Sequence, residues 1–278
     1  MTATQGAPRR PLPFLRDPIL WAGGAVWLLS LLPSLADVLP SDLAFSWADQ
    51  YSDVPMLGFV VVAAAMRARA ALDRKERTFW RLFIAGNMSW IAVRGLYVGV
   101  PYAQRGMKSD LFTDVSYLLG YLCLIAALEL RPDRVPPGRT RAGKVESLGV
   151  QTFAFLMLSY FTLAPSVFNP EAYASWVTSM ALYAVLDAWL LAHAVRLLRA
   201  GLAPGWVVPV RWLAGAFAVW LVGDVMEGLM YMKAIPYIDA GSPVDVVWAA
   251  PQLLLLLAVR SRVWWASPGP AARPVTAM

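Results

Sequence analysis

Eight apolar runs, separated by short polar segments, constrain this chain more than any other feature of its sequence. A helix needs about 20 mainly apolar residues to cross a hydrocarbon core about 30 Å thick. The runs occupy residues 19–39, 55–72, 79–100, 111–130, 148–167, 177–198, 212–232 and 244–259. Composition agrees, because 59% of the 278 residues are hydrophobic and only 15% are charged, against about 25% charged in soluble domains. We therefore expect an all-α integral membrane protein with eight transmembrane helices, and we exclude a disordered chain.

The basic residues predict how these helices are oriented. With the N-terminus in the cytoplasm, 20 of the 24 lysines and arginines fall in the tails, loops and span ends on the cytoplasmic side. The remaining four are Arg94, Arg105, Lys108 and Lys233. This asymmetry is the positive-inside pattern, so we expect both termini in the cytoplasm. The net charge of +6 thus follows from topology, and the expected partner is the lipid bilayer rather than a nucleic acid.

The two halves of the chain resemble each other. At an offset of 130 or 131 residues the matched pairs are Arg81 with Arg211, Trp90 with Trp220, Arg94 with Asp224 and Asp114 with Asp245. We expect two four-helix halves, 18–131 and 148–265, joined by a cytoplasmic linker at 132–147 and flanked by disordered tails at 1–17 and 266–278. Four spans in each half give both halves the same orientation, which predicts a two-fold axis along the membrane normal.

A few ionisable residues interrupt the apolar runs, and each needs a partner or a cavity because charge in hydrocarbon is costly. The candidate ligand-binding residues are Arg94, Asp114, Asp187, Asp224 and Glu227. Asp187 lies near mid-membrane and the others in the outer half, which predicts an outward-open polar pocket. Asp224 and Glu227 are three residues apart and share one helix face, and Arg94 would hold an acidic ligand or pair with Asp224. The alternative is structural: packing pairs and, for Asp114 and Asp245, helix N-caps.

Other chemistry has little support in the sequence. A single histidine, His193, and a single cysteine, Cys123, exclude a disulfide, bis-histidine haem ligation and a His-rich zinc site within one chain. Two Asp-x-x-x-Asp pairs occur, Asp49 with Asp53 and Asp110 with Asp114. Such pairs can hold a divalent cation, as membrane prenyl-transfer enzymes require for their diphosphate substrates. Both pairs lie on the outer side here, whereas those substrates are cytosolic. We therefore expect no metal, no cofactor and no catalytic residues.

Four segments carry a resemblance to a known type of module: LFTDVSYLLGYLCLIAALELR, ALYAVLDAWLLAHAVRLLR, RWLAGAFAVWLVGDVMEGLMY and SPVDVVWAAPQLLLLLAVR. With aspartates and aromatic residues recurring just inside apolar helices, residues 78–262 resemble the multi-pass N-terminal sensor region of bacterial GGDEF/EAL diguanylate cyclases and phosphodiesterases and of some histidine kinases. Those proteins continue into an output domain, whereas this sequence ends about a dozen residues after Trp265.

The resemblance implies a sensory or regulatory module of the bacterial inner membrane that acts through a cytoplasmic or membrane partner. Its ligand would be a small molecule, a lipid component or a proton, and a homo-oligomer is compatible with the sequence. Two alternatives stay open, a small secondary transporter and a lipid-modifying membrane enzyme. A transporter needs a continuous pathway past Asp187 toward the inner side, whereas a sensor needs only an outer pocket and a partner.

Overall fold

The structure is a computed structural model, and its description covers only part of the chain. The described residues are 13–35, 47, 53–99, 107–130, 148–149, 152–153, 155–157, 159–160, 177–238 and 241–264. All regular structure within these ranges is helical. The expected linker 132–147, the tail 266–278 and most of the expected tail 1–17 lie outside the described residues.

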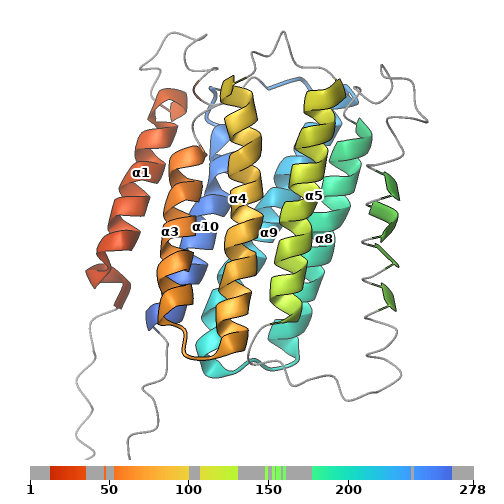
Figure 1. Cartoon of the computed structure of the whole chain (residues 1–278). Coiled ribbons are helices and arrows are strands. Elements are labelled where there is room, and N and C mark those ends of the chain that lie inside the picture. Colours follow the sequence, from red (N-terminus) through yellow and green to blue (C-terminus); the bar gives the residue numbers. More distant parts are fainter. Residues whose placement is uncertain are drawn as a thin grey trace, which may run out of the picture.

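The described residues include seven long helices, which run side by side (Figure 1). After a short 3-10 helix, η1 (Pro13–Arg16), they are α1 (Pro18–Leu35), α3 (Val54–Ala70), α4 (Arg74–Gly99), α5 (Met107–Glu129), α8 (Val177–Arg199), α9 (Pro204–Tyr231) and α10 (Asp245–Trp264). Each corresponds to one expected apolar run. Of the remaining run, the described residues between 148 and 160 are all helical, and Phe153, Met157 and Tyr160 pack against the core.

Several helices extend beyond their apolar runs on the side we expect to be cytoplasmic. α4 begins at Arg74 instead of residue 79, with the Asp73 carboxylate accepting the Glu76 backbone N–H at 3.3 Å. α9 begins at Pro204 instead of residue 212, and proline suits the first turn because its missing N–H has no helical partner there. α10 continues to Trp264 instead of ending at residue 259. Hydropathy alone underestimates these ends, because polar residues extend a helix past the apolar region.

Six of the helices form a closed ring, with α1 outside it. α3, α4 and α5 make one row, and α10, α9 and α8 make the other row behind it (Figure 1). The rows meet where α3 packs on α10 and where α5 touches α8, while α1 packs on α3 and α10. Arg260 near the end of α10 donates to Asp17 just before α1, with Nε 2.8 Å from Oδ2. The start of α1 and the end of α10 therefore lie on the same face of the bundle.

Five of the described helices are long and apolar enough to cross a membrane: α1, α5, α8, α9 and α10. α3 has 17 residues, and α4 carries Asn87 and Arg94 within its apolar part besides a charged first turn. The protein is therefore an all-helical chain with a membrane location supported by five helices.

The α3–α4 hairpin and the α8–α9 hairpin share their spacing. α4 begins at Arg74 and α9 begins 130 residues later, at Pro204. Buried positions of the first hairpin recur at the same offset in the second: Met56 with Leu186, Val60 with Leu190, Ala64 with Ala194, Phe83 with Leu213 and Val93 with Gly223. The two hairpins therefore bury the same helix faces.

Candidate functional site

Asp187 is the most unusual side chain of the described bundle. It lies on α8 with 0% of its surface exposed, and neither carboxylate oxygen has a well-formed hydrogen bond. Its neighbours are Asp224 on α9 and Tyr121 on α5. A buried polar group without such bonds is costly, and a buried charge is far more so. Packing alone does not explain an aspartate at this position, so Asp187 is a candidate functional residue.

Asp224 extends the site on α9. Its recorded interactions are with Asp187, Tyr121 and Glu227, which is three residues further along the same helix. Neither Asp187 nor Asp224 has a basic side chain among its interactions within the described residues. Three carboxylates thus gather at one place, as their sequence positions on α8 and α9 allowed, and Asp187 and Asp224 have no cationic partner among the described residues.

Asp114 forms a second layer further out, in contact with α8. The Tyr183 hydroxyl donates to Asp114 Oδ1, and Ser179 Oγ donates to Oδ2 at 3.3 Å. Since α5 begins at Met107, Asp114 lies two turns inside the helix, and its interpretation as an N-cap is wrong. Its side chain instead joins α5 to α8.

Asp245, in contrast to Asp114, does lie at the start of a helix, because it is the first residue of α10. Its Oδ2 accepts hydrogen bonds from the backbone N–H of Gly241 at 2.8 Å and from Ser34 Oγ of α1 at 2.5 Å. Asp245 therefore ties the start of α10 to α1, which is a structural role.

Aromatic side chains connect the acid cluster to the centre of the bundle. The ring centroids of Tyr121 lie 6.1 Å from Tyr183 and 6.2 Å from Trp90, and those of Trp90 and Trp220 lie 4.6 Å apart. Sequence analysis did not single out Tyr121. A signal for it was present, because Tyr121 falls seven residues after Asp114 and so lies on the same face of α5.

Arg94 does not meet Asp224, contrary to expectation. It makes an ion pair with Asp53, immediately before α3, and the exposed fractions of the two side chains are 18% and 7%. The groups that act on Asp224 among the described residues are Asp187, Glu227 and Tyr121. The reason is that Asp53 belongs to the hairpin partner of α4, whereas Asp224 on α9 turns toward α8. Arg94 thus belongs to a structural pair outside the acid cluster.

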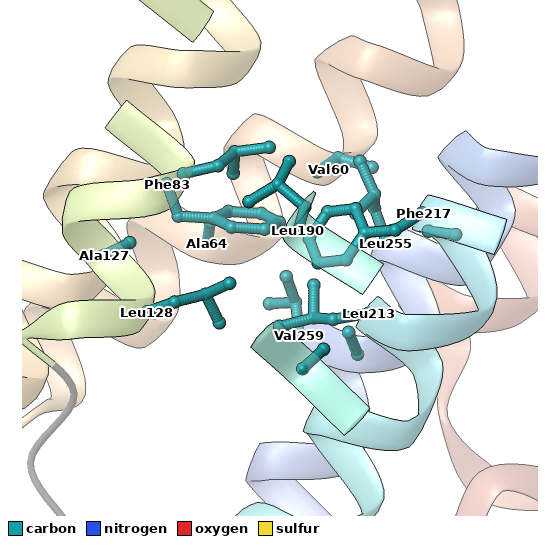
Figure 2. Packing of buried hydrophobic residues seen from close by; sticks show 14 of the residues in the cluster. Val60, Ala64, Phe83, Ala127, Leu128, Leu190, Leu213, Phe217, Leu255 and Val259 are labelled. Carbon is teal, nitrogen blue, oxygen red and sulfur yellow. The ribbon is translucent and has the colours of Figure 1, made fainter. Parts of the chain in front are cut away.

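An apolar layer lies one helical turn inward from Asp187. Figure 2 shows Val60, Ala64, Phe83, Leu128, Leu190, Leu213 and Val259 converging from six helices. Leu190 follows Asp187 on α8, and its side chain is fully buried. One buried polar side chain adjoins this layer: Asn87 of α4 is fully buried, its Nδ2 donates to the Phe83 carbonyl oxygen at 2.8 Å, and its Oδ1 has no hydrogen-bond partner among the described residues.

On the far side of this layer, His193 meets Glu129, with Nε2 3.1 Å from Oε1. The imidazole is buried and stacks on Trp189 at 5.1 Å between ring centroids. His193 therefore joins α8 to α5 near the Arg199 end of α8.

Metal binding has no support in the described ranges, where no group of three or more His, Cys, Asp or Glu side chains could hold an ion. Asp53 of the first Asp-x-x-x-Asp pair is engaged by Arg94, while Asp49 and the side chain of Asp110 lie outside the described residues.

No protein-family model, no curated protein and no solved structure matches this chain. The resemblance to bacterial sensor regions therefore stays a prediction.

Proposed function

We propose that this protein is a sensory or regulatory module of the bacterial inner membrane. A small ligand, lipid component or proton binds in the outer half, at the cluster formed by Asp187, Asp224, Glu227 and Tyr121, and the change passes to a cytoplasmic or membrane partner. The observation that carries this proposal is the pair of carboxylates formed by the fully buried Asp187 and the half-buried Asp224, which have no basic partner among the described residues. A site that lacks its own counter-charge gains most from an external one.

The proposed topology has eight spans, with both termini in the cytoplasm. The ion pair between Asp17 and Arg260 supports it, because it brings the start of α1 and the end of α10 to one face. α3 and α4 cross the membrane as a hairpin in this proposal, matching α8 and α9. The eighth span includes the helical residues between 148 and 160.

The proposed architecture is a pair of four-helix halves related by a two-fold axis along the membrane normal. A residue on such an axis meets its own counterpart, and Trp90 packs against Trp220, its match at an offset of 130. The helix neighbours agree too. The repeat matches α3 with α8 and α5 with α10, so contact between α3 and α10 requires contact between α8 and α5, and both contacts are present. We call the contact surface between the halves, which includes Trp90 and Trp220, the wall between the halves, and we expect movement there.

The apolar layer favours a sensor over a transporter. A transported solute needs polar access from both sides of its site, whereas Leu190, Phe83 and Leu128 pack together in an apolar layer (Figure 2), with Asn87 as a buried amide beside it. A closed inner side suits a site that is read from outside. A lipid-modifying enzyme gains no specific observation from the described residues.

The cytoplasmic end offers a route for the output. Glu76 of α4 accepts hydrogen bonds from Arg67 of α3 and from Arg262 of α10, and the Arg262 guanidinium lies 4.9 Å from the ring centroid of Trp206 on α9. These contacts join the inner ends of four helices. A shift of α9 at the acid cluster would therefore change the contacts of this network.

The test uses a fluorescent label on the cytoplasmic side. Leu72, 98% exposed in the turn between α3 and α4, is replaced by cysteine in a Cys123→Ala background, labelled, and placed in nanodiscs. Asp187→Asn removes the charge at the site and so imitates an occupied state. At alkaline pH with no ligand added, we expect the label's emission to differ between wild type and Asp187→Asn, and to stay unchanged in the matched variant Asp245→Asn. Identical emission in all three proteins would overturn the proposed function.

A further inference from the structure

We propose that the ligand of this site is a proton, held between Asp187 and Asp224 and exchanged with the outer side only. This inference rests on the proposed function and names the ligand class of the same site. It is argued from charge, space and access in turn.

Charge comes first. The groups that face Asp187 are Asp224, with Glu227 beyond it, from α9, Tyr121 from α5, and Tyr183 on its own helix. All of these are acidic or phenolic. Two adjacent carboxylates in a low-dielectric interior cannot both stay charged without a positive counterpart, and one shared proton removes this conflict.

Space selects the proton among possible cations. Asp187 is fully enclosed, and the side chains of Tyr121 and Tyr183 beside it are also buried, at 5% and 4% exposure. Adjacent rings lie 6.1 Å apart between centroids, a distance at which they pack against each other. A hydrated metal ion or an organic cation would need these rings to move apart. A proton needs no added volume, because it forms an O–H bond on one carboxyl group that donates to the other.

Access decides the side. Outward of the pair lie Glu227 and the hydrogen-bonded group of Asp114, Tyr183 and Ser179, which can pass a proton through their hydroxyl and carboxyl groups. Inward lies the apolar layer with Leu190 and Phe83, and Asn87, the buried amide beside it, has no ionisable group to carry a proton. His193 and Glu129 are beyond that layer, six residues or more along their helices from Asp187 and Tyr121. The site therefore equilibrates with the outer solution.

The consequence of losing the proton is mechanical. Asp187 on α8 and Asp224 on α9 then repel each other, and Tyr121 loses its place between them. Tyr121 contacts Trp90, which packs on Trp220 at the wall between the halves. Deprotonation would thus loosen this wall, and the proton acts as the ligand that closes it.

Infrared spectroscopy of the full chain in nanodiscs tests the assignment. We expect a carbonyl band of a protonated carboxyl group at neutral pH that disappears on alkaline titration. The band should be absent or displaced in Asp187→Asn and in Asp224→Asn, and retained in the matched variant Asp245→Asn. An identical band in Asp187→Asn and wild type, or no such band in wild type, would overturn the inference.

Sidedness and ligand identity need a second measurement. The Leu72→Cys label is followed in oriented proteoliposomes while pH is changed on one side at a time. We expect a response to outer pH only, and none when sodium chloride or guanidinium chloride is varied at constant pH and ionic strength. A label that shifts in Asp187→Asn but ignores pH would leave the proposed function standing and remove the proton. A response to sodium or guanidinium would likewise replace the proton with that cation.

Discussion

Two groups of helices, α3 with α4 and α10, and α8 with α9 and α5, contain hairpins that bury matching faces. They differ in how their charged residues are paired. In the group of α3, α4 and α10, Arg94 pairs with Asp53, and Asp245 is held by Ser34 and Gly241. In the group of α5, α8 and α9, Asp224 stands where the first half has Arg94, and Asp187 stands where it has Leu57. The burial of these positions is alike. One hairpin thus carries an ion pair, and the other carries an acid pair that has no basic partner among the described residues.

This difference teaches how a site can arise without a new fold. Replacing a basic by an acidic residue at one position, and an apolar by an acidic residue at another, leaves helix packing intact while changing the charge. A buried ion pair mainly fixes structure, and breaking it is costly because one charge stays behind. An acid pair without counter-charge responds to whatever supplies one. The following predictions ask whether the two groups behave as differently as their charges require.

The largest effect is expected at the closed pair. Arg94→Met leaves Asp53 as an unpaired, nearly buried carboxylate, so the free energy of unfolding should fall by about 3 kcal/mol. Equilibrium unfolding in mixed detergent micelles measures it. The control is Arg69→Met, at an exposed position of α3, which should change little. A loss below about 1 kcal/mol would mean that the pair is effectively solvated.

Next comes the contact through which the acid cluster reaches the wall between the halves. A Cβ on Gly120 would lie 2.9 Å from both Ser89 Oγ and Trp90 Nε1. Gly120→Ala should therefore displace Trp90 and cost about 2 kcal/mol, as overpacking typically does. Gly95→Ala, where nothing lies within 4 Å, is the matched control and should be neutral or slightly stabilising. Thermal unfolding of both variants decides whether the α4–α5 contact is as tight as described.

The third prediction compares one substitution in both groups. Asp53→Asn removes a paired charge and should destabilise, whereas Asp187→Asn removes an uncompensated one and should stabilise by about 1 kcal/mol at alkaline pH. If the folded acid pair retains a proton that the unfolded chain releases, wild-type stability falls as pH rises. The gain from Asp187→Asn should accordingly grow with pH. Melting temperatures measured from weakly acidic to alkaline pH test this, and equal signs for the two variants would contradict the comparison.

The smallest effects concern neutral hydrogen-bond donors to the two outer aspartates. Tyr183→Phe removes the hydroxyl that donates to Asp114, and Ser34→Ala removes the one that donates to Asp245. Each should cost about 1 kcal/mol. The cost should be lower for Ser34→Ala, because Asp245 keeps the Gly241 N–H. Unfolding measurements that rank the two variants in the reverse order would show that Asp245 depends more on α1 than described.

Much of the architecture followed from local sequence. Each described long helix coincides with an apolar run because backbone groups in hydrocarbon must be paired within a helix. The helix ends at Arg74, Pro204 and Trp264 were not predicted. Charged and proline-containing turns lower the hydropathy, so they fall outside an apolar run even when they are helical. The eight-span topology and the repeat of halves stay predictions.

The candidate site was predicted in its members but only partly in its geometry. Asp187, Asp224 and Glu227 do gather, as expected from their depth on adjacent helices. Arg94 was placed with the wrong partner, because its choice between Asp53 and Asp224 depends on which way α4 is rotated. Tyr121 was overlooked, because a tyrosine in an apolar run is not distinguished by composition.

The sequence by itself determined the environment of this protein and the short list of ionisable residues that its helices bury. Hydrophobicity and the distribution of basic residues are properties that add up along a chain, and no partner is needed to read them. The tertiary structure decided which of those residues are neutralised. Whether a carboxylate meets an arginine, a hydroxyl group or another carboxylate depends on helix rotation and neighbour choice. Those are set by packing across the whole bundle, where Arg94 pairs with Asp53, and Asp187 and Asp224 find no counter-charge in the described part of the chain.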